Sequence, residues 1–103
     1  MIDLGLIEGF DWDEGNAYKS DKHGISSSEA EQIFINEPLL LLCDEKHSQK
    51  EPRYHALGKT NDGRILHVTF TLREKGTKIR VISARPAHKK ERVIYEQKTK
   101  AGA

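Results

Sequence analysis

The sequence predicts an α+β domain in which two N-terminal helices precede a four-stranded antiparallel sheet and a C-terminal helix follows it. Three observations predict this order. Helix start and stop signals fill residues 11–38, apolar and polar residues alternate between residues 53 and 85, and a charged helical pattern follows Pro86. The 103 residues suit one domain with one core, so we expect a single unit over residues 1–103.

The two N-terminal helices are predicted from their end signals. Asp13 is a candidate N-cap for the first helix, which we expect to end at residues 22–24, where Gly24 suits the left-handed C′ position. Ser26 or Ser27 can cap the second helix with Glu29 as its capping-box partner, and Pro38 closes it. Two short helices are therefore expected before residue 38.

Four strands follow, which we expect to form a meander. Asp-Gly at residues 62–63 is a strong hairpin signal and Lys-Gly at 75–76 is a weaker one. The expected strands are residues 39–43, 53–60, 64–72 and 78–85, and a closing helix is expected at residues 87–98. The tail, residues 98–103, is expected to fray.

The strand register decides which side chains share a face. Even positions from Leu66 to Leu72 are apolar and predict a core face, whereas odd positions are mostly polar. A two-residue turn at 75–76 places Thr71 opposite Arg80 and Arg73 opposite Lys78, so that Arg73, Lys78, Arg80 and His67 share the open face.

The first hairpin permits two registers. A two-residue loop would pair Leu57 with Val68 and bury Arg53, whereas a three-residue loop brings Arg53 and His55 beside Thr71 and Thr69. We favour the second register because burying an unpaired guanidinium is costly.

Composition excludes several protein classes. The longest purely apolar run, residues 39–43, is far too short to span a membrane, and the N-terminus lacks a basic signal region, so we expect a cytoplasmic protein without a membrane partner. A net charge of +1 conceals halves of −8 (residues 1–51) and +9 (residues 52–103). Either the basic half meets a polyanion, or the two halves attract each other within the fold.

A cationic sheet face with a nearby histidine could cleave RNA without a metal. Such cleavage needs an acceptor for the 2′-hydroxyl proton, cations around the dianionic phosphorane, and an acid for the leaving 5′ oxygen. Arginine supplies only the cation, because its pKa is too high for proton transfer, whereas His23 is a suitable proton carrier. Lys22, Glu91 and Tyr95 are weaker candidates. No metal-binding or phosphate-loop motif is present, and we expect no metal or other cofactor.

Short blocks between residues 10 and 96 form an ordered set. The set comprises Phe10-Asp-Trp-Asp13, Lys22-His23-Gly24-Ile25-Ser26, Glu29-Ala30, Phe34, Arg53 with Leu57-Gly58, Gly63-Arg64, Thr71-Leu-Arg73, Ile79-Arg80-Val-Ile-Ser-Ala-Arg85, Glu91-Arg92 and Tyr95-Glu96. No block is specific by itself, but their order is, and in this order the set resembles the BrnT family of toxins. The four leucines at residues 39–42 depart from the family pattern, which bears on packing rather than on catalysis.

The resemblance implies a RelE-like fold and a ribonuclease toxin of a type II toxin–antitoxin pair, which would inhibit translation and growth. It also implies a BrnA-like antitoxin, promoter DNA contacted only through the complex, and a homodimer or a toxin–antitoxin heterotetramer. Mapped onto this chain, the catalytic positions are His23, Arg73, Arg80 and Arg85, and the RNA-binding positions are Lys22, Arg53 and Lys78. We expect the antitoxin to cover the basic sheet face or the closing helix.

Two other readings compete with a ribonuclease. A noncatalytic nucleic-acid-binding module would bind RNA with strong salt dependence and would not cleave it. A pure interaction protein would use its basic half to dock an acidic partner and would show no affinity for RNA.

Overall fold

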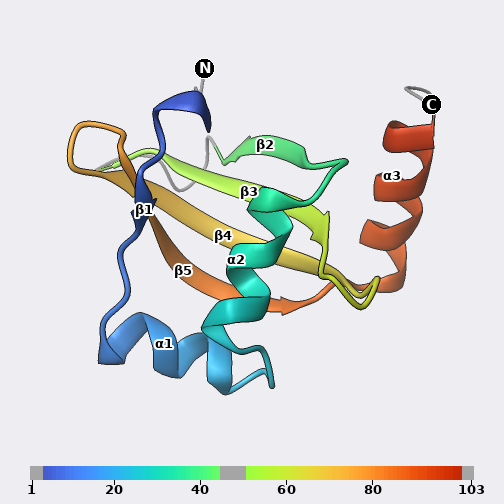
Figure 1. The fold of residues 1–103 in the computed structure, drawn as a ribbon. Helices are drawn as coiled ribbons and strands as arrows, with labels where there is room; N and C mark the ends of the chain where they lie inside the picture. The colour runs from blue at the N-terminus through green and yellow to red at the C-terminus, as the bar shows by residue number, and fades with distance from the viewer. Residues whose placement is uncertain (1–3, 45–50, 101–103) are drawn as a thin grey trace.

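The computed structural model describes residues 4–44 and 51–100 (Figure 1), which form one five-stranded sheet with three α-helices. A short 3-10 helix at Leu4–Leu6 comes first. The strands are β1 (Gly9–Phe10), β2 (Leu40–Asp44), β3 (Arg53–Lys59), β4 (Ile65–Arg73) and β5 (Lys78–Pro86), and the helices are α1 (Glu14–Asp21), α2 (Ser27–Ile35) and α3 (Lys89–Lys100). None of the described helices is long and apolar enough to cross a membrane.

The predicted four-stranded meander is confirmed for β2 to β5, but the predicted strand number is wrong. The sheet order is β1-β5-β4-β3-β2, and β1 adds a fifth, parallel strand through the pairs Gly9↔Lys78 and Phe10↔Ile79. Two residues are too few to show the alternation from which a strand is predicted. This strand forms only because the chain before α1 runs along β5.

The N-terminal helices begin at the predicted caps. Asp13 accepts a hydrogen bond from the Asn16 backbone N–H through Oδ1 (3.1 Å), and the chain turns after α1 at Gly24, where φ is +75°. Ser26 and Glu29 form a reciprocal capping box at the start of α2. The closing helix is shifted two residues from its expected position, and residues 98–100 are helical rather than frayed; residues 101–103 lie outside the described part of the chain.

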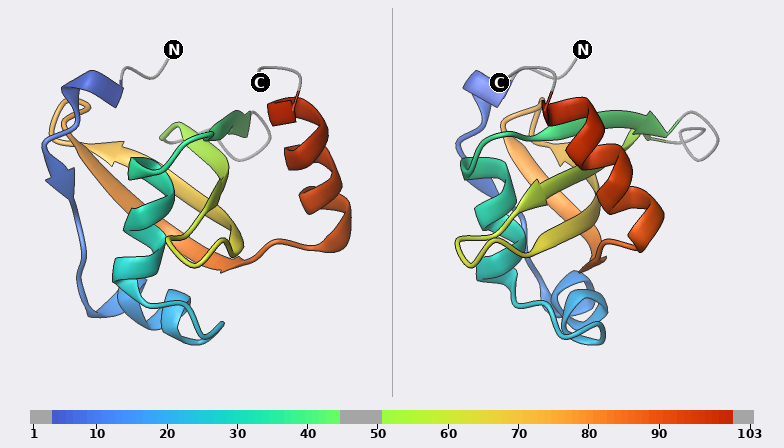
Figure 2. Two further views of the ribbon diagram at one scale, coloured as in Figure 1. Left: turned by 45° about the vertical axis from the view of Figure 1, so that its right-hand side comes forward. Right: turned by 90° about the vertical axis from the view of Figure 1, so that its right-hand side faces the viewer.

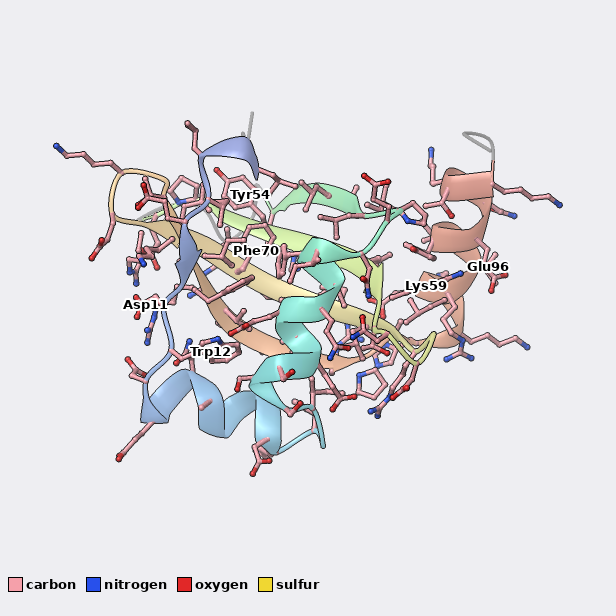
Figure 3. The ribbon with its side chains drawn as sticks, in the orientation of Figure 1. Asp11, Trp12, Tyr54, Lys59, Phe70 and Glu96 are labelled. Atoms are coloured by element: carbon pink, nitrogen blue, oxygen red, sulfur yellow. The ribbon has the colours of Figure 1, made fainter. Side chains whose placement is uncertain are left out.

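The main core lies between α2 and one face of the sheet. The Phe34 ring of α2 meets the Phe70 ring of β4 edge-on with centroids 5.0 Å apart, and Tyr54 packs beside Phe70 at 5.4 Å (Figure 3). α2 comes so close to β3 that a Cβ on Gly58 would lie 2.9 Å from the Cβ of Ile33. This close approach requires glycine on the strand beneath the helix.

α3 covers only part of the opposite face of the sheet. It lies against β2 and β3 (Figure 2). Its buried Tyr95 packs with Leu57 and Ala87 in a second, smaller cluster. The rest of this face carries the polar residues of β3, β4 and β5, and we call it the open face. The candidate site is built there.

Candidate active site

The second hairpin has the predicted register, which places three cations on the open face. Thr71 lies opposite Arg80 and Arg73 opposite Lys78, while Phe70 and Val81 pair on the core face. Directly opposite side chains lie within about 5.5 Å at Cβ. Arg73, Lys78 and Arg80 therefore form one basic group at the β4–β5 turn.

The favoured register of the first hairpin is also confirmed. His55 pairs with Thr69 and Leu57 with His67, so Leu57 does not pair with Val68. Arg53 begins β3, pairs in register with Asp44 of β2, and is half-buried. It thus lies on the open face, two strands away from Arg80.

A β-bulge brings Arg85 onto the same face. The pairing shifts between Phe70↔Val81 and Thr69↔Ser83, which leaves Ile82 as an extra residue on β5. Strict alternation from Arg80 would point Arg85 into the core. Because of the bulge, Arg85 lies opposite His67 on the open face instead.

Carboxylates hold the three predicted catalytic arginines. Arg80 binds Asp13 at 2.8 Å and Asp11 at 3.4 Å, and Arg73 binds Glu51. The Asn16 backbone N–H and then the Arg80 guanidinium keep the pKa of Asp13 below its ordinary value. These ion pairs join the acidic and the basic half of the chain, so attraction between the halves does operate within the fold.

Arg85 forms the most complete of these pairs. Its Nη1 and Nη2 bind the two oxygens of Glu91 at 2.7 and 2.9 Å, and the His88 backbone N–H donates to the same carboxylate at 2.8 Å. These hydrogen bonds, Arg85 foremost, lower the pKa of Glu91 to about 2. Glu91 is thus an anion that orients Arg85 rather than a proton donor.

Two histidines with neighbouring rings, His55 and His67, lie beside this pair, and the sequence analysis did not identify them as a pair. The rings of His55 and His67 are 4.8 Å apart, and Nε2 of His67 lies 3.7 Å from a Glu91 oxygen. His55 is held by Asp44 at 3.0 Å and by Thr69 at 3.1 Å. Burial, and then Arg85, lower the pKa of His67 to about 4, so its imidazole is neutral at pH 7.

The structure does not bring His23 into this cluster. His23 and Lys22 are exposed in the turn that follows α1, and within the described part of the chain the His23 ring has no hydrogen bond or ion pair. Tyr95, a weaker proton-transfer candidate, is buried and donates its hydroxyl to the Pro38 carbonyl at 2.6 Å. Its position is that of a core residue.

The register therefore collects Arg73, Lys78, Arg80 and Arg85 along β4 and β5, with the neutral His67 among them. A family model described as "Ribonuclease toxin, BrnT, of type II toxin-antitoxin system" matches residues 12–91. This range begins just before α1 and ends in the first turn of α3, so it includes all seven predicted site residues. No curated protein matches the chain.

Proposed function

Because the chain belongs to the BrnT family of ribonuclease toxins of type II toxin–antitoxin systems, we propose that it cleaves RNA on the open face of its sheet without a metal. The 2′-hydroxyl of the substrate attacks the adjacent phosphate, the 5′ oxygen leaves, and a 2′,3′-cyclic phosphate remains. Cleavage of cellular RNA by this route would stop translation and growth. The observation that carries the proposal is the alignment of Arg80 and Arg85 on one face by the bulge.

In this proposal Arg73, Arg80 and Arg85 stabilise the dianionic phosphorane. A guanidinium has five N–H donors, so an arginine that one or two carboxylate oxygens already orient keeps donors for phosphate. Lys22, Arg53 and Lys78 would bind the RNA backbone on either side. His23, exposed and free to approach a bound strand, would carry the proton.

The test is RNA cleavage by the purified chain in excess EDTA. We expect Arg80→Ala and His23→Ala to lower the rate by roughly 10²-fold or more, in line with loss of one transition-state contact or one proton carrier. Arg64→Ala is the matched control, because Arg64 is exposed and pairs with Glu29 away from the open face. An RNA with a 2′-deoxy nucleotide at the cleaved position should resist cleavage.

Three results would contradict the proposal. Cleavage that requires added metal would exclude the metal-independent route, and full activity in both variants would exclude these site residues. Salt-sensitive RNA binding without cleavage would favour a noncatalytic binding module instead.

A further inference from the structure

Three side chains form a hydrogen-bonded array across the open face. The carboxylate of Asp44 on β2 lies 3.0 Å from Nε2 of His55 on β3, and Nδ1 of the same ring lies 3.1 Å from the hydroxyl oxygen of Thr69 on β4. A carboxylate, an imidazole and a hydroxyl in this order form the arrangement that activates the hydroxyl of many hydrolases, here with the two ring nitrogens exchanged. We call these three residues the Thr69–His55–Asp44 array.

The carboxylate determines which ring nitrogen is basic. An ionised carboxylate only accepts hydrogen bonds, so neutral His55 carries its hydrogen on Nε2, toward Asp44, and leaves Nδ1 as an acceptor. The Thr69 hydroxyl then donates to Nδ1. The Asp44 side chain is 11% exposed and the His55 side chain 28%, so the array leads from a nearly buried anion to a ring that solvent reaches.

The array lies in the row of residues between Arg80 and Arg85. Ser83 separates these arginines on the open face of β5, and it pairs with Thr69 of the neighbouring β4 (Figure 1). Residues two apart on a strand lie about 7 Å from each other, so the two arginines lie about 13 Å apart across this row. A phosphate that both guanidinium groups contact therefore lies above Ser83 and Thr69.

Cleavage of RNA by its own 2′-hydroxyl needs two proton transfers, one from that hydroxyl and one to the leaving 5′ oxygen. His23 accounts for one of them. We propose that the Thr69–His55–Asp44 array is the general base: the Thr69 hydroxyl takes the 2′ proton as it passes its own hydrogen to His55. This inference rests on the proposed RNA cleavage, and it makes His23 the general acid.

Each proton and electron pair has a destination in this step. The 2′ oxygen bonds to phosphorus while its proton moves to Oγ1 of Thr69, and the Thr69 hydrogen moves to Nδ1 of His55. The bond from phosphorus to the 5′ oxygen breaks, and this oxygen takes a proton from His23. His55 ends as an imidazolium whose Nε2–H still faces Asp44, and water restores both histidines.

The groups around His55 suit a proton acceptor. The ring of His67 on β4 lies 4.8 Å away and is neutral at pH 7, because burial above all lowers its pKa to about 4. It therefore adds no positive charge that would oppose protonation of His55. The charged residues on the adjoining elements are Asp44, Arg53 and Glu91, of which Asp44 is hydrogen-bonded to the ring and stabilises its imidazolium.

The test is cleavage of a short RNA by the purified full chain in EDTA, in single-turnover reactions. His55→Gln and Thr69→Val should each lower the maximal rate roughly 10²-fold or more with RNA affinity unchanged, and Thr69→Ser should restore most of the rate. His55→Gln should also lose the rise of the rate with pH. The matched controls are His88→Gln and Thr99→Val, whose side chains lie outside the array and which should cleave at the unchanged rate.

An RNA with sulfur in place of the 5′ oxygen at the cleaved bond separates base from acid. A thiolate leaves without being protonated, because the pKa of a thiol is only about 8.5. This substrate should restore the rate of His23→Ala but not that of His55→Gln or Thr69→Val. Rescue of His55→Gln instead would make His55 the acid and overturn the proposal.

Two further results would overturn the proposal, and they differ in what they leave standing. Full activity of both array variants, or weakened RNA binding at an unchanged maximal rate, would contradict the general base alone while the unchanged chain still cleaves RNA. Absence of cleavage by the unchanged chain would contradict the ribonuclease mechanism and the general base with it.

Discussion

Replacing His67 with asparagine should make the fold less sensitive to acid. The His67 side chain is 14% exposed and is enclosed by Arg85, Glu91 and the ring of His55. Burial and then Arg85 lower its pKa from 6.5 to about 4. As the pH falls, the unfolded chain therefore binds a proton at His67 at a higher pH than the folded chain does.

The sign and size of the effect follow from this difference. His67 causes no loss of stability above pH 6.5, and stability is lost as the pH falls from about 6.5 toward 4, because protonation favours the unfolded state. A pKa difference of about 2.5 corresponds to a loss of ~3 kcal/mol in the free energy of unfolding, which is complete once the pH is below both pKa values. Between pH 7.5 and pH 5 the loss should be about 2 kcal/mol.

The measurement is the free energy of unfolding in urea at several pH values between 7.5 and 5, for the unchanged chain and for His67→Asn. Loss of the ring contacts also changes the absolute stability of the variant, so the comparison is between the slopes of stability against pH. His88→Asn is the control, because His88 approaches the same Glu91 carboxylate at 3.8 Å but its side chain is 72% exposed. Equal slopes in the unchanged chain and His67→Asn would refute the reasoning.

Three further variants test how the fold supports the site. Gly58→Ala should lower the free energy of unfolding by roughly 1–3 kcal/mol, because its Cβ would lie 2.9 Å from the Cβ of Ile33; an unchanged melting curve would contradict the close approach. Ser26→Ala should cost about 1 kcal/mol by the same assay through loss of the α2 capping box, and no loss would show the cap to be unimportant. Tyr95→Phe should cost about 1 kcal/mol by leaving the Pro38 carbonyl unpaired, yet keep RNA cleavage; lost cleavage in a folded variant would restore Tyr95 as a proton-transfer candidate.

Local signals predicted much of the fold because each one has a local cause. The Ser26–Glu29 capping box involves residues three apart, and the register of β3 against β4 followed from the cost of burying Arg53 alone. β1 could not be found in this way. Its pairing with β5 depends on where the chain lies after folding, and two residues carry no periodic signal.

The uneven distribution of charge was visible in the sequence, but the ion pairs that the charged residues form were not. Nothing in the spacing of Asp11 and Asp13 from Arg80 indicates that they meet, because the contact depends on β1 lying along β5. The same is true of the contact between the rings of His55 and His67, which the register places on neighbouring strands. Residues far apart in sequence share this site through strand pairing, so their ion pairs appear only in the folded chain.

The bulge at Ile82 shows how one residue determines the composition of the site. Without it, the alternation of β5 would put Arg85 on the core face, where a buried guanidinium would have no carboxylate. With it, Ala84 enters the core and Arg85 reaches Glu91 on the open face. The family resemblance selected Arg85 although the alternation of the strand argued against it. The bulge removes that conflict, because its one extra residue reverses the alternation of side chains along β5. Arg80 and Arg85 can therefore lie on the same face.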